Sequence, residues 1–131
     1  MTQADNHSAE PTFNLPEMLA RVDNDREFLC ELLEIFKKEL PPLLLSLQEA
    51  VSCENMKLVE AEAHNLKGMC ATLSAARAAS AASQLEQMGR GEVEKSRLKE
   101  LLAAFESELA VLMTEINNHI AEGTHEDSHR G

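Results

Sequence analysis

Residues 57–73, KLVEAEAHNLKGMCATL, place apolar side chains at steps of three and four, the spacing of one face of an α-helix. These apolar residues are Val59, Ala63, Leu66, Cys70 and Leu73. A second face at the same spacing is polar or small and carries His64, Lys67 and Gly68. A glycine inside a helix costs about 1 kcal/mol relative to alanine, so Gly68 suggests that something approaches the backbone closely. The segment predicts an amphipathic helix with one face in a core.

A second, longer apolar pattern precedes this segment and predicts another helix. Its members are Phe28 or Leu29, Leu32, Phe36, Leu40, Leu43, Leu47 and Ala50 or Val51. Pro41 and Pro42 lie within it, and a proline inside a helix costs roughly 3 kcal/mol. Because the pattern keeps its spacing across the two prolines, we predict one kinked helix rather than two.

Three further helices are predicted around these two. Pro16 suits the first turn of a short helix that ends near Val22, and residues 23–25 (Asp-Asn-Asp) supply capping side chains for the next helix. Ser74 is the predicted N-cap of an alanine-rich helix over residues 75–90, which ends near two glycines. The last helix is predicted from about Val93 to Ile120, with a nearly heptad apolar pattern.

The predicted fold is all-α, an antiparallel up-down-up-down four-helix bundle with a short N-terminal capping helix. Short connections between amphipathic helices favour this topology. With hydrophobic residues at 44% and aromatic residues at 3%, the core must be built from good helix formers such as Leu, Ala and Met. We predict one domain over residues 15–121, a disordered leader over 1–14 and a disordered tail over 122–131.

Charge and composition exclude several kinds of partner. The 131 residues carry a formal net charge of −11 without a Lys/Arg cluster, which disfavours nucleic acid. No apolar run approaches 18 residues and no signal-peptide pattern is present, so we expect a cytoplasmic protein that does not bind membranes. The three cysteines fit neither a disulfide framework nor a zinc site and are predicted to be buried thiols. A metal site from His119, Glu122, His125 and His129 is disfavoured, because most of these residues lie in the predicted tail.

His64 is the histidine with a candidate chemical role, since it lies in the middle of a predicted helix and outside the apolar stripe. An imidazole can carry a phosphoryl group covalently, Lys67 could offset the charge on that group, and Gly68 would leave room for a partner. From spacing alone, a solvated surface face without chemistry is an equally good interpretation.

The segment AHNLKGMCATLSA, residues 63–75, resembles the signature of histidine-containing phosphotransfer (HPt) domains, a histidine followed by x-[Leu/Ile]-Lys-Gly. The resemblance extends upstream to DREFLCELLEIFKKELPPLL, which is similar to the family's first bundle helix with its proline-marked bend. Downstream it includes QLEQMGRG, in which Leu85 and Glu86 match a common family pair. In all, it covers roughly residues 15–116.

This resemblance implies that the chain relays a phosphoryl group between receiver-domain aspartates in a two-component phosphorelay. His64 would be the phosphoacceptor, Lys67 the charge partner and Gly68 the clearance residue, with Glu86 and Arg90 as possible secondary site residues. The chain would be a phosphocarrier without a kinase activity or ATP site, and magnesium would bind to the receiver. Implied partners are a response-regulator receiver domain, a hybrid sensor histidine kinase, or both. We expect a monomer.

Two departures from the family pattern and two alternative functions accompany this hypothesis. Ser74 stands where the family often has glycine, and Glu86 where some members have glutamine, so Glu86 is expected to pair with Lys67 or to orient the imidazole. The main alternative is a non-catalytic helical adaptor, in which the His64 face has no chemical role. A histidine kinase dimerisation domain is less consistent, because Asn-Leu-Lys-Gly follows the histidine in place of the acidic residue and Arg-Thr-Pro run expected there.

Overall fold

The computed structural model of this chain describes residues 14–91 and 95–130, with side chains for residues 14–91 and 96–122. Within these ranges the chain forms helices and no strands, so the predicted all-α class is confirmed. The helices are α2 (Leu15–Arg21), α3 (Arg26–Ser52), α4 (Met56–Thr72), α5 (Ala76–Gly89), the 3-10 helix η1 (Lys95–Arg97) and α6 (Leu98–Arg130). The predicted leader, apart from Asn14, lies outside the described residues.

α3 runs without interruption through both prolines, as the constant spacing of its apolar residues predicts. Asp25, one of the three predicted capping residues, begins the helix, and its side chain accepts a hydrogen bond of 3.0 Å from the backbone N–H of Phe28. Leu29, Leu40 and Leu47 are buried in the core. One turn after Leu29 the buried leucine is Leu33 rather than the predicted Leu32.

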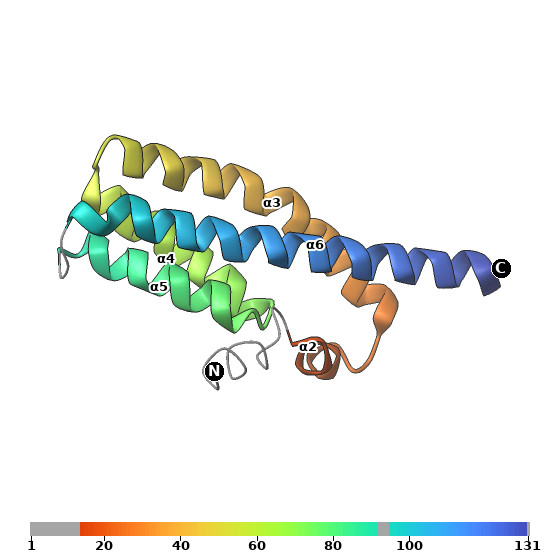
Figure 1. The fold of residues 1–131 in the computed structure, drawn as a ribbon. Coiled ribbons are helices and arrows are strands. Elements are labelled where there is room, and N and C mark those ends of the chain that lie inside the picture. Colours follow the sequence, from red (N-terminus) through yellow and green to blue (C-terminus); the bar gives the residue numbers. More distant parts are fainter. Residues whose placement is uncertain (1–13, 92–94, 131) are drawn as a thin grey trace, which may run out of the picture.

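The four long helices lie alongside one another (Figure 1). α4 packs against α3 and α5, and α6 also packs against α3 and α5. All five residues of the apolar pattern predicted in the α4 segment are fully buried. The largest side chain in the core is Phe105 of α6, with no exposed surface. The opposite face of α4 is therefore left at the surface.

The short helix α2 is attached to the turn between α4 and α5. The Arg21 guanidinium donates a hydrogen bond of 2.7 Å to the carbonyl of Thr72, one of the last residues of α4. The backbone N–H of Asn14 donates to the carbonyl of Ser74 at 3.0 Å. A cation at a helix C-terminus satisfies open carbonyl groups and interacts favourably with the helix dipole. This contact joins residues far apart in the sequence, and the spacing of apolar residues does not reveal it.

The prediction that Ser74 caps α5 is wrong. Ser74 follows α4 with a left-handed φ of 56°, and the N-cap of α5 is Ala75, whose side chain makes no capping hydrogen bond. The Ser74 hydroxyl oxygen is buried without a hydrogen-bond partner. Glycine adopts a left-handed conformation without steric cost, so a glycine at this position would avoid both the strained backbone and the unpaired hydroxyl.

Ser74→Gly is therefore expected to raise the free energy of unfolding by about 1 kcal/mol, because it removes both the left-handed strain and the unpaired hydroxyl. Urea denaturation would measure this change. Glu54→Gly is the matched control, since Glu54 is exposed and has a similar φ of 54°, so it relieves strain alone and should gain less. A loss of stability in Ser74→Gly would contradict the explanation.

α6 differs from the predicted last helix at both ends. Residues 95–97 form η1, the α-helix begins at Leu98, and residues 92–94 of the predicted start lie outside the described residues. At the other end α6 extends to Arg130, through the segment predicted as a disordered tail from residue 122. No proline follows Ile120, and a single Gly123 costs only about 1 kcal/mol in a helix. The division of the chain into leader, bundle and tail stays a prediction.

The three cysteines occupy different environments, and no disulfide joins them. Cys70 is buried in the core, as predicted, and burial raises the pKa of its thiol to about 12. Cys30 is half-buried and Cys53 is exposed, so the prediction of a buried thiol is wrong for Cys53.

Candidate functional site

The register of α4 directs His64 away from the core. Its neighbours Ala63 and Leu66 are fully buried, and the residues that follow them at helical spacing continue the packed face. His64 is consequently turned outward, with 64% of its side-chain surface exposed. An imidazole in this position can be reached by a second protein without any movement of the helices.

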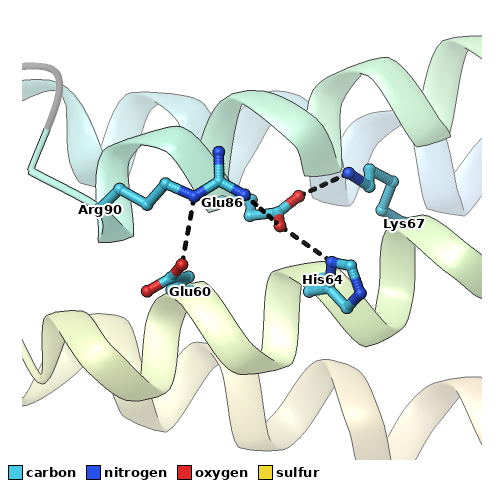
Figure 2. A network of polar contacts seen from close by, with 5 residues as sticks. All are labelled: Glu60, His64, Lys67, Glu86 and Arg90. Atoms are coloured by element: carbon cyan, nitrogen blue, oxygen red, sulfur yellow. Dashed lines mark hydrogen bonds and ion pairs between the residues drawn. The ribbon is translucent and has the colours of Figure 1, made fainter.

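Glu86 of α5 lies directly beside this histidine. Its carboxylate Oε2 is 2.9 Å from Nδ1 of His64, and its Oε1 is 2.7 Å from Nζ of Lys67 (Figure 2). Only 4% of the Glu86 side chain is exposed. His64 and Lys67 are one helical turn apart, so one carboxylate from the neighbouring helix holds both. The structure therefore shows Glu86 in contact with both Lys67 and the imidazole, and its role in orienting the ring stays a prediction.

Arg90 extends the same network along α5. Its Nη2 is 2.9 Å from Oε2 of Glu86, and its Nε is 3.2 Å from Oε2 of Glu60 on α4 (Figure 2). Arg90 is also the C-cap residue of α5, where a positive charge is favourable. The same side chain therefore lies at the helix end and contacts the buried carboxylate.

The network keeps Glu86 ionised although it is buried. The hydrogen bond from Lys67 is the largest cause that lowers the pKa of Glu86 below the ordinary glutamate value, and the contact with His64 lowers it further. Burial acts in the opposite direction and raises it, but the net direction is downward. A buried carboxylate is tolerated when its oxygens are paired with cations and hydrogen-bond donors, and both oxygens of Glu86 are.

The ionised carboxylate determines which nitrogen of His64 is available. A carboxylate can only accept hydrogen bonds, so Nδ1, at 2.9 Å from it, must carry a proton. In the neutral ring the lone pair is then on Nε2, which points away from Glu86 (Figure 2). An exposed nitrogen lone pair with an ammonium group one turn away can attack a phosphoryl group and offset part of its charge.

Two glycines of the site have opposite surroundings. A Cβ added to Gly68 would meet nothing within 4 Å among the described residues, so no packing against them explains the glycine. A Cβ added to Gly89 would lie 2.7 Å from Cα of Glu60, which means that α5 approaches the α4 backbone there as closely as glycine allows. The sequence interpretation of Gly89, a helix-terminating glycine, misses this close approach.

The model of the Hpt domain family matches residues 31–113, more than half of the chain and all the residues of the site. This chain belongs to the Hpt domain family. The resemblance to Hpt domains that the His64 motif indicated is thereby confirmed. Hpt domains act in phosphotransfer within phosphorelays and interact there with receiver domains and kinases. No curated protein and no solved structure matches the chain.

Four of the five predicted site residues of this Hpt domain, His64, Lys67, Glu86 and Arg90, form one connected network, and Gly68 lies beside it on α4. Sequence reasoning missed Glu60 as a member. Glu60 lies four residues before His64 and therefore on the same helix face, a signal that could have identified it. Lys57, at the start of α4, is exposed and lies outside the network.

The described residues of this Hpt domain contain neither a candidate metal site nor a membrane-spanning helix. Within the residues that the structure describes, no cluster of three or more His, Cys, Asp or Glu side chains could hold a metal ion. None of the helices in the same ranges combines the length and apolar character needed to cross a membrane.

Proposed function

We propose that this Hpt domain relays a phosphoryl group between receiver-domain aspartates in a two-component phosphorelay, through a phosphohistidine at His64. One observation carries the proposal: an exposed Nε2 on a histidine whose Nδ1 is held by a buried, ionised glutamate. If His64 had no chemical role, a buried carboxylate that contacts both its ring and Lys67 would not be required.

Lys67 and Gly68 have complementary roles in this proposal. Lys67 is the charge partner: its ammonium is held on the same carboxylate as the ring, and 35% of its side-chain surface is exposed, so it can turn toward an arriving phosphoryl group. Gly68 is the clearance residue, because none of the described residues fills the space beside it and the α4 backbone there is left accessible to a partner.

The rest of the chemistry is assigned to the partner. A receiver domain would supply the aspartate and the magnesium, and the Hpt domain would have no kinase activity or ATP site of its own. The partners are a response-regulator receiver domain, a hybrid sensor histidine kinase, or both, and the chain acts as a cytoplasmic monomer. Its helices form the antiparallel up-down-up-down bundle with α2 as an N-terminal cap, and the contacts of α4 and α6 with both α3 and α5 support this arrangement.

The proposal is tested by incubating the chain with receiver domains that carry a labelled aspartyl phosphate. We expect the label to appear on the chain in an acid-labile, alkali-stable form, the behaviour of a phosphohistidine. Phosphoramidate, a small phosphodonor, serves as a second source that requires no protein docking. A chain that accepts label from neither source would overturn the proposal and favour the non-catalytic adaptor.

Gly68→Gln is expected to separate docking from chemistry. Because no described part of the chain occupies the space around Gly68, the variant should fold, and it should gain up to about 1 kcal/mol from the better helix former. Its transfer rate from a receiver should fall by about 100-fold, since a displaced partner loses the geometry of in-line transfer. Labelling by phosphoramidate should change little.

The matched control is Ala104→Gln, which adds the same side chain at an exposed position of α6. This variant should keep the rate of the unmodified chain with both donors. Equal receiver rates for the Gly68 and Ala104 variants would show that Gly68 provides no clearance for the partner.

A further inference from the structure

Glu86 is the one charged side chain that is buried within the described part of the chain, with 3% of its surface exposed. Its two carboxylate oxygens contact different groups. Oε1 pairs with Lys67, whereas Oε2 contacts both Nδ1 of His64 and the Arg90 guanidinium. A glutamine could not reproduce this arrangement, because one half of an amide is a donor and would face either a cation or a ring N–H.

The charged groups around the imidazole come from two helices. Glu60 and Lys67 are contributed by α4, and Glu86 and Arg90 by α5 (Figure 2). Of these four, Glu86 alone has a contact with the ring. Arg90 and Lys67 reach the ring only through its carboxylate, and Glu60 only through Arg90. Within the network, the contact with the ring is therefore made by one carboxylate oxygen, Oε2 of Glu86.

We propose that Glu86 is a positioning residue that keeps a proton on Nδ1 of His64 both before and after phosphoryl transfer, and so sets the pH range in which the phosphoryl group can leave. This inference rests on the proposed function and extends it. It assigns to Glu86 a role that depends on the charge of the carboxylate and not only on its shape.

The transfer step balances with that proton in place. The Nε2 lone pair of the neutral ring attacks phosphorus, the Nε2–P bond forms, and the bond between phosphorus and the aspartyl oxygen breaks. The electron pair of the broken bond remains on the aspartate, which becomes a carboxylate. The ring now bears the phosphoryl group on Nε2 and its original proton on Nδ1, and the positive charge of the ring faces the Glu86 carboxylate. No proton is gained or lost.

The same proton governs the reverse step. When the N–P bond breaks, the electron pair returns to Nε2. A ring protonated on Nδ1 departs as neutral imidazole, whereas a ring without that proton would have to depart as an anion, which is a much poorer leaving group. A carboxylate next to Nδ1 favours the protonated form. The phosphohistidine therefore stays competent for transfer up to a higher pH than it would beside an uncharged side chain.

The test compares the chain with Glu86→Gln and Glu62→Gln after phosphorylation by phosphoramidate. The rate at which each loses phosphate is measured from pH 5 to pH 10. We expect the midpoint of the profile to lie about one pH unit lower in Glu86→Gln, at the small end of the effect of a nearby charge because Lys67 and Arg90 offset part of it. Glu62 is a half-buried α4 residue outside the network of ion pairs around His64, and its variant carries the same change in net charge.

A purely structural role for Glu86 would lower the rate at every pH and leave the midpoint in place. Equal midpoints in all three proteins would overturn the inference, even though phosphorylation itself would still support the proposed function. If instead no protein is phosphorylated by either donor, the proposed function fails.

A second measurement requires no variant and no phosphorylation. Nitrogen-15 NMR of the unmodified chain at pH 8 reports which ring nitrogen of His64 carries the proton. We expect the proton on Nδ1. A proton on Nε2 would contradict the inference directly, whatever the folding of Glu86→Gln.

Discussion

His64→Gln is expected to abolish phosphoryl transfer to the chain completely, from a phosphorylated receiver and from phosphoramidate alike. Glutamine has a similar length and can still donate a hydrogen bond toward Glu86, but it has no nucleophilic nitrogen. Because His64 is largely exposed, the free energy of unfolding should change by no more than about 0.5 kcal/mol. Loss of label with an unchanged denaturation curve would place the defect in the chemistry and not in the fold.

His119→Gln is the matched control for this variant. His119 is a half-buried histidine on α6, outside the network around His64. The control should accept label at the rate of the unmodified chain. Label that persists on His64→Gln would mean that another residue is the acceptor, and the site described above would then lose its proposed role.

Gly89→Ala is expected to lower the free energy of unfolding by about 2 kcal/mol, although alanine is the better helix former. A methyl group at Gly89 would lie 2.7 Å from the Cα of Glu60, and a backbone atom cannot move aside as the end of a flexible side chain can. Overpacking of this kind costs up to about 3 kcal/mol, and the gain in helix propensity returns about 1 kcal/mol. Urea denaturation of both proteins would measure the difference.

Gly68→Ala is the matched control for Gly89→Ala, because it makes the same substitution at another glycine of the same protein. Both glycines lie in helices, but the space around Gly68 is open, so its alanine variant should gain up to about 1 kcal/mol. Opposite signs for the two substitutions would confirm that α5 and α4 touch at Gly89. A stabilising Gly89→Ala would mean that the helices can separate there at little cost.

Much of the fold could be predicted from local patterns. Residues at steps of three and four identify a helix whatever surrounds it, which is why the face of α4 around Leu66 was predicted correctly and α3 was predicted to continue through Pro41. Local patterns do not indicate which backbone conformation a residue in a turn must adopt. Ser74 is a common capping residue, but here it must adopt a left-handed conformation that depends on the packing of two helices.

The site was predicted in part. Residues close together in the sequence could be grouped from the pattern, whereas contacts between residues far apart could not. His64, Lys67 and Gly68 are neighbours on one helix and could be grouped by spacing. Glu86 and Arg90 come from the next helix, and only the resemblance to Hpt domains suggested that they lie nearby. The ion pair of Arg90 with Glu60 and the contact of Gly89 with the α4 backbone depend on how deeply α5 packs against α4, which no local pattern specifies.

The most direct test of the central claim is to locate the phosphoryl group after transfer from a phosphorylated receiver domain. Proton–phosphorus NMR at alkaline pH, where a phosphohistidine is stable, distinguishes the two ring nitrogens. We predict that the phosphoryl group is bonded to Nε2 of His64, the nitrogen that Glu86 leaves free. A phosphoryl group on Nδ1, or on any other residue, would contradict the role proposed for this histidine.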